Sequence, residues 1–349
     1  MKKKRKKKQL TAKQANLRMV RRIVLAVLAV VALLVGIPVV TIYSKLAKVK
    51  TLKPPTDIVK PEDENFEQDV AGSESEGEKL LKMDPADIDW SEIEPFFDDD
   101  LINIMLIGQD RQEGEARQRS DSMILCSINP ENGKVSLISF MRDLYVQIPG
   151  GYSDNRLNAA YAFGGFPLLA DTIYTNFGIT IDGSVEVDFN GFSQVIDTLG
   201  GVDIQLTAQE AEVVRGGAVE GMNHLDGEHV LEYARIRKID NDFNRTQRQR
   251  NVLEAIYKKF RDADAGSLMQ LLDKLLPCLS TDMSSTQILL LAAKIVPDIS
   301  SLKLSAYRIP SDDSYYNANI RRMAVLVPDL EKIHDHLEKE YLPLSESKK

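Results

Sequence analysis

The 349-residue sequence predicts a single extracytoplasmic α/β domain, with a central mixed β-sheet flanked by helices, behind an N-terminal transmembrane helix. Three observations lead to this prediction. From residue 100 onwards, short apolar runs typical of strands alternate with helical patterns, which favours one layered α/β domain. One uncharged apolar run lies close to the N-terminus, and an acidic, proline-containing segment separates it from the alternating part.

The first 43 residues predict the membrane topology. Residues 1–22 hold eleven lysines and arginines and no acid, and residues 23–43 carry no charge. A helix rises about 1.5 Å per residue, so this run matches a hydrocarbon core of roughly 30 Å. No small-residue cleavage site follows, since the next residues, S-K-L-A-K-V-K, are basic. We expect an uncleaved, single-pass signal anchor at 23–43, with the basic tail in the cytoplasm and the remainder outside the cell membrane.

Residues 44–99 are expected to form an acidic, extended tether, because their low hydrophobicity and repelling acids disfavour a packed core. The whole chain has a formal net charge of −8, but without the basic tail it has 33 bases against 52 acids, a net charge of −19. A basic cluster inside so acidic a body is therefore informative. Cys126 and Cys278 have apolar neighbours, which favours two buried free thiols, although a single bridge would also fit.

The domain, residues 100–349, is expected to begin with strands at 101–108, 121–130 and 134–140, the last two joined by an E-N-G turn. One broken helix or two short ones should follow at 157–178, then a strand at 183–189, a helix at 190–201 and a strand at 202–206. Glycines end both helical patterns. The remaining expected elements are helices at 226–237, 242–261, 267–279 and 285–296, a strand at 301–310 and a C-terminal helix at 323–341.

The segment from Glu232 to Gln249, E-Y-A-R-I-R-K-I-D-N-D-F-N-R-T-Q-R-Q, gathers four arginines. At about 100° per residue, Arg245 and Gln249 continue the apolar stripe of the second helix, whereas Arg248 flanks the stripe and Arg250 points away from it. A buried unpaired charge is very costly, so Arg245 needs an anionic partner. That partner is either a structural carboxylate, Asp242 or Asp240, or a bound anion.

Other arginines favour the bound anion. Arg235 and Arg237 lie at the end of the preceding helix, and Arg142 follows a strand in F-M-R-D. Binding sites of α/β sheets often lie beyond strand ends. A guanidinium binds phosphate oxygens with two parallel hydrogen bonds and keeps its proton. Several converging arginines carry more charge than one phosphate balances, which favours a pyrophosphate.

Two aspartates predict a metal site nearby. Asp110 follows the first expected strand and Asp121 precedes most of the second. If the two strands are neighbours, both carboxylates lie at one edge of the sheet. Mg²⁺ and Mn²⁺ bind through such oxygens together with substrate phosphates. The loop between them also holds Arg119.

Six segments, in order, resemble the signature blocks of the LytR-CpsA-Psr family: G-Q-D-R, R-S-D-S, F-M-R-D, R-L-N-A-A-Y-A-F-G-G, L-D-G-E-H-V-L-E-Y-A-R-I-R and D-F-N-R-T-Q-R-Q. The resemblance covers roughly residues 100–262. It implies an enzyme in the envelope of a Gram-positive-type bacterium. Such enzymes move an anionic glycopolymer, of teichoic acid or capsular type, from a polyprenyl-pyrophosphate carrier to a peptidoglycan sugar hydroxyl.

The resemblance also implies residue roles. Asp110 and Asp121 would position the divalent cation, and Asp242 would be the acidic residue of the same pocket and a candidate base. The candidate catalytic residues are Arg119, Arg142, Asp242 and Arg245. The pyrophosphate would be held by Arg119, Arg142, Arg235, Arg237, Arg245 and Gln249. Arg156 stands where the family often has lysine. Apolar helices within 157–177, 267–279 and 286–296 are candidates to line a groove for the carrier, although core packing explains each of them equally well.

Two other functions fit the same residues. A hydrolase acting on the same pyrophosphate lipid would use water in place of the sugar. A non-catalytic lipid-carrier binder, or a regulator of the envelope, would bind without reacting. The cytoplasmic tail of 22 residues is too short for a DNA-binding fold, so we expect no nucleic-acid partner. The sequence also lacks a G-x-S-x-G elbow and a Walker loop.

Overall fold

The computed structural model describes residues 44–52, 80–88, 90, 92–109, 120–237, 239–262, 273–295 and 301–346. The chain divides into two units, Met1–Lys48 and Val49–Lys349, and the second holds all the elements named below. Within the described ranges, no helix has both the length and the apolar character needed to cross a membrane. The predicted anchor, residues 23–43, and most of the predicted tether lie outside those ranges.

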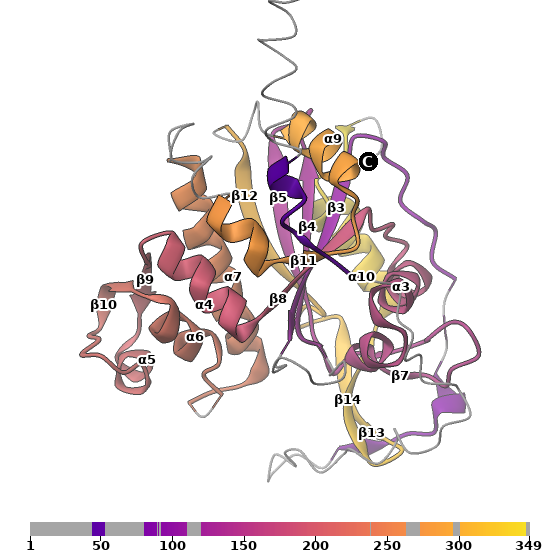
Figure 1. The fold of residues 1–349 in the computed structure, drawn as a ribbon. Helices are drawn as coiled ribbons and strands as arrows, with labels where there is room; N and C mark the ends of the chain where they lie inside the picture. The colour runs from indigo at the N-terminus through magenta and orange to yellow at the C-terminus, as the bar shows by residue number, and fades with distance from the viewer. Residues whose placement is uncertain are drawn as a thin grey trace, which may run out of the picture. The chain divides into compact units, whose positions relative to one another are not determined.

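A mixed β-sheet forms the centre of the domain, as the sequence predicts (Figure 1). Its strands in the described residues run in the spatial order β1 (Lys50–Thr51), β11 (Ser280–Thr281), β8 (Gly183–Asp188), β3 (Ile102–Gln109), β4 (Ser120–Asn129), β5 (Lys134–Phe140) and β12 (Lys303–Ile309). The pairs β1–β11, β3–β8 and β5–β12 are parallel and the other neighbours are antiparallel.

One face of the sheet packs against α3 (Leu157–Phe177). Alternate strand residues such as Met105, Met123 and Ile138 point to this face and join the main core. The predicted break in the helix is confirmed, because Gly165 has φ 67° and ψ −155° inside α3. Gly178 ends the helix in the left-handed conformation, as its position in the sequence predicts.

The opposite face is covered by α4 (Phe189–Thr198), α6 (Gly227–Ala234) and α7 (Asp242–Arg261), which lie together across the sheet from α3 (Figure 1). Beside them, β9 (Val202–Leu206), β10 (Gly221–Leu225) and α5 (Ala208–Val213) form a small lobe with its own apolar cluster. The bounds of α7 match the prediction. The preceding helix is shorter than the predicted 226–237, because Asp226 caps its start and Arg235 already lies at its end.

The C-terminal part departs from the prediction of a helix at 323–341. Residues Met323–Pro328 form strand β14, which pairs with β13 (Tyr315–Ile320), and β13 pairs with β2 (Leu81–Lys82). The stretch M-A-V-L-V-P is rich in β-branched residues, and its proline ends it. Asp329 then caps α10 (Leu330–His336), which a π-helical turn, Leu337–Tyr341, continues.

The smaller elements complete the chain. A short two-stranded ladder follows β5, and α9 packs its apolar side against the sheet near Ile102 and Val135. The predicted helix at 267–279 is described only from Asp273 onwards. The bounds of these elements are β6 Tyr145–Val146, β7 Asn155–Arg156, α9 Ser285–Ile295, and 3₁₀ turns at Pro85–Asp87 and Leu276–Cys278.

Candidate active site

Asp242, at the start of α7, lies between two of the predicted arginines. Its Oδ2 is 2.9 Å from Arg245 Nη2 and 3.7 Å from Arg142 Nε. Arg245 is only 2% exposed. The Asn241 side chain caps the helix by accepting a hydrogen bond from the Asn244 amide, which fixes the first turn that carries Asp242. The structure therefore brings Arg142, Asp242 and Arg245 together, and the carboxylate partner that the sequence left open for Arg245 is Asp242.

The loop after β5 holds Arg142 in place through a second carboxylate. Asp143 lies 3.5 Å from Arg142 Nε with one oxygen and 3.5 Å from Arg156 Nε with the other. Arg156 also donates to the carbonyl oxygen of Ala324 at 2.9 Å, and the Leu326 amide donates to the Asp143 carbonyl at 3.0 Å. Strand β14 thus supports the arginine loop. Sequence reasoning missed Asp143, although it directly follows Arg142 in F-M-R-D.

Gln249 and Arg235 lie at an apolar pocket between the sheet and the helices α4, α6 and α7. Gln249 lies one turn beyond Arg245 on α7, and the Arg235 guanidinium stacks 4.2 Å from the centre of the Phe189 ring. The pocket encloses about 220 Å³. The polar residues Ser122 and Asp188 also line it, and the rest of the lining is apolar and includes Leu106, Ile124, Val185, Val187, Phe189, Phe192, Val195, Leu231, Val252, Leu253, Ile256 and Leu279.

This lining differs from the predicted groove. Of the described residues in the segments 157–177, 267–279 and 286–296, only Leu279 lines the pocket. Helix α3 covers the other face of the sheet, where its apolar side chains form core, and α9 packs on a separate cluster. The amphipathic pattern alone did not indicate which face of the sheet each helix covers. Arg237 follows α6 and is exposed.

The structure describes only part of the predicted metal site. Asp110 and Arg119 lie outside the described residues, and of Asp121 only the backbone, in β4, is described. Strands β3 and β4 are antiparallel neighbours, as the metal prediction required. Gly108 pairs with Ser122 and Gln109 with Ser120, so Asp121 is the extra residue of a β-bulge. In the described ranges, no group of three or more candidate ligand side chains gathers.

Comparison with known proteins decides the family. A model described as the LytR_cpsA_psr family matches residues 65–339, well over half of the chain. The chain belongs to the LytR-CpsA-Psr family. The family that the signature blocks resemble is therefore confirmed.

Similar curated proteins are named polyisoprenyl-teichoic acid–peptidoglycan teichoic acid transferase TagU. The Bacillus anthracis protein is 31% identical over 240 residues, which cover 68% of this chain and 69% of the relative. The Halalkalibacterium halodurans protein is 36% identical over 200 residues, which cover 55% and 63%. These homologues of the LytR-CpsA-Psr chain are thus teichoic acid transferases.

Solved structures agree with the observed fold. The crystal structure of B. subtilis TagV has a TM-score of 0.57 and 30% identity, and covers 71% of this chain and all of TagV. The LytR-CPS2A-psr family protein YwtF (TagT) with bound octaprenyl pyrophosphate lipid has a TM-score of 0.53 and 25% identity, and covers 72% of this chain and 93% of that one.

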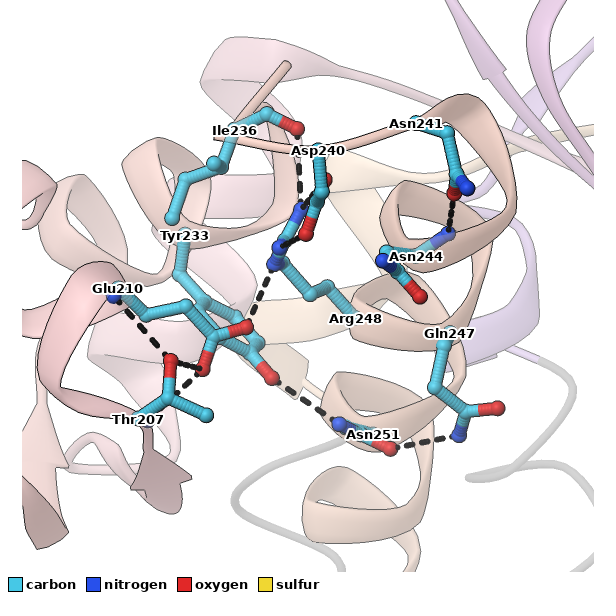
Figure 2. A network of polar contacts seen from close by, with 10 residues as sticks. All are labelled: Thr207, Glu210, Tyr233, Ile236, Asp240, Asn241, Asn244, Gln247, Arg248 and Asn251. Atoms are coloured by element: carbon cyan, nitrogen blue, oxygen red, sulfur yellow. Dashed lines mark hydrogen bonds and ion pairs between the residues drawn. The ribbon is translucent and has the colours of Figure 1, made fainter. Parts of the chain in front are cut away.

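In this LytR-CpsA-Psr protein, Arg248 has a different environment from Arg245 (Figure 2). Its Nε donates to Glu210 Oε1 at 2.7 Å, its Nη2 pairs with Asp240, and its Nη1 donates to the Ile236 carbonyl at 3.1 Å. Burial acts to lower the pKa of Arg248, but the hydrogen bonds to Asp240 and Glu210 outweigh it and raise that pKa. The second oxygen of Glu210 accepts from the Thr207 amide in a capping box. Arg248 is therefore a neutralised, structural arginine.

Proposed function

We propose that this chain is a membrane-anchored phosphotransferase. It moves an anionic glycopolymer, of teichoic acid or capsular type, from a polyprenyl-pyrophosphate carrier to a sugar hydroxyl of peptidoglycan. The observation that carries the proposal is the apolar pocket of about 220 Å³ with Arg235 and Gln249 at its lining, one helical turn from the Arg142–Asp242–Arg245 cluster. An apolar chain joined to an anionic head fits such a combination. The names of the curated relatives and the lipid bound to TagT support it.

The reaction forms one bond and breaks another at the same phosphorus. The acceptor oxygen attacks the phosphorus next to the polymer, the bond to the bridging oxygen breaks, and polyprenyl phosphate leaves. Arg142 and Arg245 would hold the pyrophosphate and stabilise the charge that develops on the leaving oxygen. Arg119, Arg235, Arg237 and Gln249 would complete the binding of the head group. The acceptor proton passes to Asp242 or to solvent.

Asp242 has one further role in this proposal. Because its Oδ2 bridges Arg142 and Arg245, it also sets the distance between the two guanidiniums. An Asp242→Asn variant keeps an acceptor oxygen for both arginines but is a far weaker base. If Asp242 is the base, this variant loses transfer at every pH tested while its affinity for the lipid stays close to that of the wild type.

We also propose that a divalent cation, Mg²⁺ or Mn²⁺, binds at the edge of the sheet where β3 ends and β4 begins. Asp110 comes directly after β3 in the sequence, and Asp121 is the bulge residue of β4, and bulges often re-aim side chains at functional sites. Two carboxylates with substrate phosphates are a usual set of Mg²⁺ ligands, so we propose that Asp110 and Asp121 hold it. When bound, the ion would neutralise charge on the pyrophosphate.

The site would lie outside the cell. We propose that residues 23–43 cross the membrane once and that the basic tail stays in the cytoplasm. Protease added to intact protoplasts should then digest the domain and spare the tail. Digestion of the tail alone would contradict this topology.

The proposed transfer is tested with the full-length chain in detergent, a polyprenyl-pyrophosphate-linked glycopolymer and a peptidoglycan acceptor. Polymer should become acceptor-linked, and Arg245→Ala should lower the rate roughly 10²- to 10³-fold, the usual cost of losing one charge-stabilising donor. Arg261→Ala is the matched control, because Arg261 lies on the same helix, is exposed and pairs with Asp262.

The competing functions give other products. Release of free polymer at the same rate with and without acceptor would identify a hydrolase and overturn the transferase. Lipid binding without any turnover, unchanged in Arg245→Ala, would identify a binder.

A further inference from the structure

Arg250 is a buried cation that the proposed reaction does not use. It lies on α7, is only 4% exposed, and has one hydrogen bond within the described residues, from its Nη2 to Gln247 Oε1 at 2.6 Å. Its Nε and Nη1 are buried without a hydrogen-bond partner there. Arg248, two residues before it, is equally buried but pairs with two carboxylates. The same helix therefore carries one neutralised and one uncompensated arginine.

A second arginine lies beside Arg250. Phe243 and Arg250 are seven residues apart, about two turns, and so share one side of α7. The guanidinium of Arg308, on β12, stacks 4.1 Å from the centre of the Phe243 ring. Burial and the charge of Arg308 together lower the pKa of Arg250 to about 10, which still leaves Arg250 charged at neutral pH. Two like charges thus lie on the side of α7 that carries Phe243, close enough for the charge of Arg308 to act on Arg250.

The countercharge of this pair is incomplete. Arg308 pairs with Asp312, whose side chain is 88% exposed, while the buried Nη1 of Arg308 has no partner in the described residues. Ser139 stands opposite Arg308 in the β5–β12 register, and its buried hydroxyl also has no partner there. The nearby Asp313 already lies 3.8 Å from His336. Two guanidiniums and a hydroxyl therefore share one exposed carboxylate, and burying a charge without its counterion is unfavourable.

We propose that Arg250 and Arg308 form a second anion site that takes a phosphate group of the transported polymer. This proposal rests on the proposed function and narrows its substrate to polymers with phosphodiester repeats. Arg308, 18% exposed in its side chain, meets the phosphate and replaces Asp312 as its partner. Arg250, the more buried of the two, supplies a second positive charge. Stacking on Phe243 fixes the plane of the Arg308 guanidinium.

The site is distinct from the pyrophosphate cluster. Arg245 and Arg250 are five residues apart on α7 and therefore point about 140° away from each other. The two sites lie at the ends of different strands. Arg142 follows β5, and Arg308 lies at the end of β12. A polymer that reaches both would place its pyrophosphate at Arg142 and Arg245 and a phosphate of its repeat at Arg308.

The test is a calorimetric titration of the full-length chain in detergent with inorganic phosphate and, separately, with a glycerol phosphodiester dimer. The wild type should bind two phosphates. The Arg250→Met and Arg308→Met variants should each bind one phosphate, at the Arg142 cluster. The Arg142→Met variant should also bind one phosphate, at Arg308. Asp312→Asn, which removes the competing carboxylate, should tighten the second site about tenfold, the value of one hydrogen bond to a charged group. Arg261→Met is the control and should change nothing.

The outcomes separate this proposal from the proposed function, because phosphate binding needs no transfer. Equal stoichiometry in the wild type and in Arg308→Met, or an unchanged affinity in Asp312→Asn, would overturn the second site even if transfer is intact. Binding of inorganic phosphate but not of the dimer would overturn the assignment to the polymer. Arg308 and Asp312 lie near the surface, so their variants keep the test decisive if Arg250→Met does not fold.

Discussion

Three arginines of one helix, α7, show how far a single residue can be interpreted from sequence. The helical angle correctly predicted that Arg245 and Gln249 face inward, because they continue an apolar stripe. It placed Arg250 on the far side from the core, yet Arg250 is buried. The reason is that α7 is covered on more than one side: it contacts β9 of the small lobe as well as β5 and β12. A helical wheel assumes one buried face, so it did not predict the partners of Arg248 or Arg250.

We expect the Arg248→Met variant to lose far more free energy of unfolding than the Arg245→Met variant. Removing Arg248 leaves Glu210 and Asp240 with no cation, and breaking a buried pair in this way costs about 3–5 kcal/mol. Urea denaturation of the two variants measures the difference. Arg215→Ala is the control: its pair with Glu232 involves an arginine side chain that is 81% exposed and should be worth under about 1 kcal/mol. A loss below 1 kcal/mol for Arg248→Met would contradict the structural role.

At the scale of elements, the local sequence pattern predicted the bounds correctly where an element has one buried face and a clear end. Strand β5 and helix α7 have the predicted bounds, and α3 is broken, at Gly165, within the segment where a broken helix or two short helices were predicted. The stretch 323–328 was predicted wrongly because a short apolar run fits a helix or a strand, and only its pairing with β13 decides. The lining of the pocket depends on the strand order, which joins segments distant in sequence and leaves no local signal.

The pocket predicts a length-dependent effect of one substitution. Val195 of α4 lines the pocket and is half-buried, so Val195→Trp should fill the space that a carrier chain needs. We expect KM for a long polyprenyl carrier to rise about tenfold or more, since each buried CH₂ contributes about 0.8 kcal/mol. KM for an analogue with one isoprene unit should change little. Equal changes for both carriers would show that the chain binds elsewhere.

The β9–β10 hairpin predicts a pH dependence. His224 Nδ1 lies 2.7 Å from Asp203 and Nε2 lies 2.8 Å from the Gly200 carbonyl, so both ring nitrogens donate only when the ring is protonated. The hydrogen bond to Asp203, and then that to Gly200, raises the pKa of His224. A raised folded-state pKa gives stability that is present below the unfolded pKa of about 6.5 and is lost as pH rises through the folded value.

We therefore expect the amides of β9 and β10 to lose hydrogen-exchange protection as pH rises above about 6.5, after correction for intrinsic exchange rates. The effect should be small, because His224 is largely exposed. His224→Gln should show no such change. A loss of protection of the same size in His224→Gln would assign it to another group.

The whole molecule places its functional groups by long-range contacts. The candidate site combines Arg142, Arg156, the start of α7 and the backbone of β14, segments far apart in the chain. The signature blocks indicated most of these residues and their family. They did not predict Asp143 as a bridge or β14 as a support, because both depend on the folded chain.

The rate at which a thiol reagent labels the two cysteines measures the opening of the sheet. Both are free, as the sequence favoured, but the prediction that both are buried is wrong, because each keeps some exposed surface. Burial raises the pKa of Cys126 to about 12, since it lies in β4 between β3 and β5, so almost no thiolate forms at neutral pH. We expect a thiol reagent to label Cys278 first and Cys126 much more slowly, at a rate that rises with urea as the sheet opens, measured by mass spectrometry. Labelling of Cys126 at a rate independent of urea would contradict this.

The hairpin of β13 and β14 also determines when the site is completed during synthesis. The loop that carries Arg142 is held by the Leu326 amide and, through Arg156, by the Ala324 carbonyl, both made long after Arg142 itself. Because a chain is synthesised from its N-terminus, the arginine cluster cannot reach its final geometry until almost the last residues have been added. A nascent chain that already holds every signature block would therefore still lack the completed arrangement of Arg142, Asp242 and Arg245.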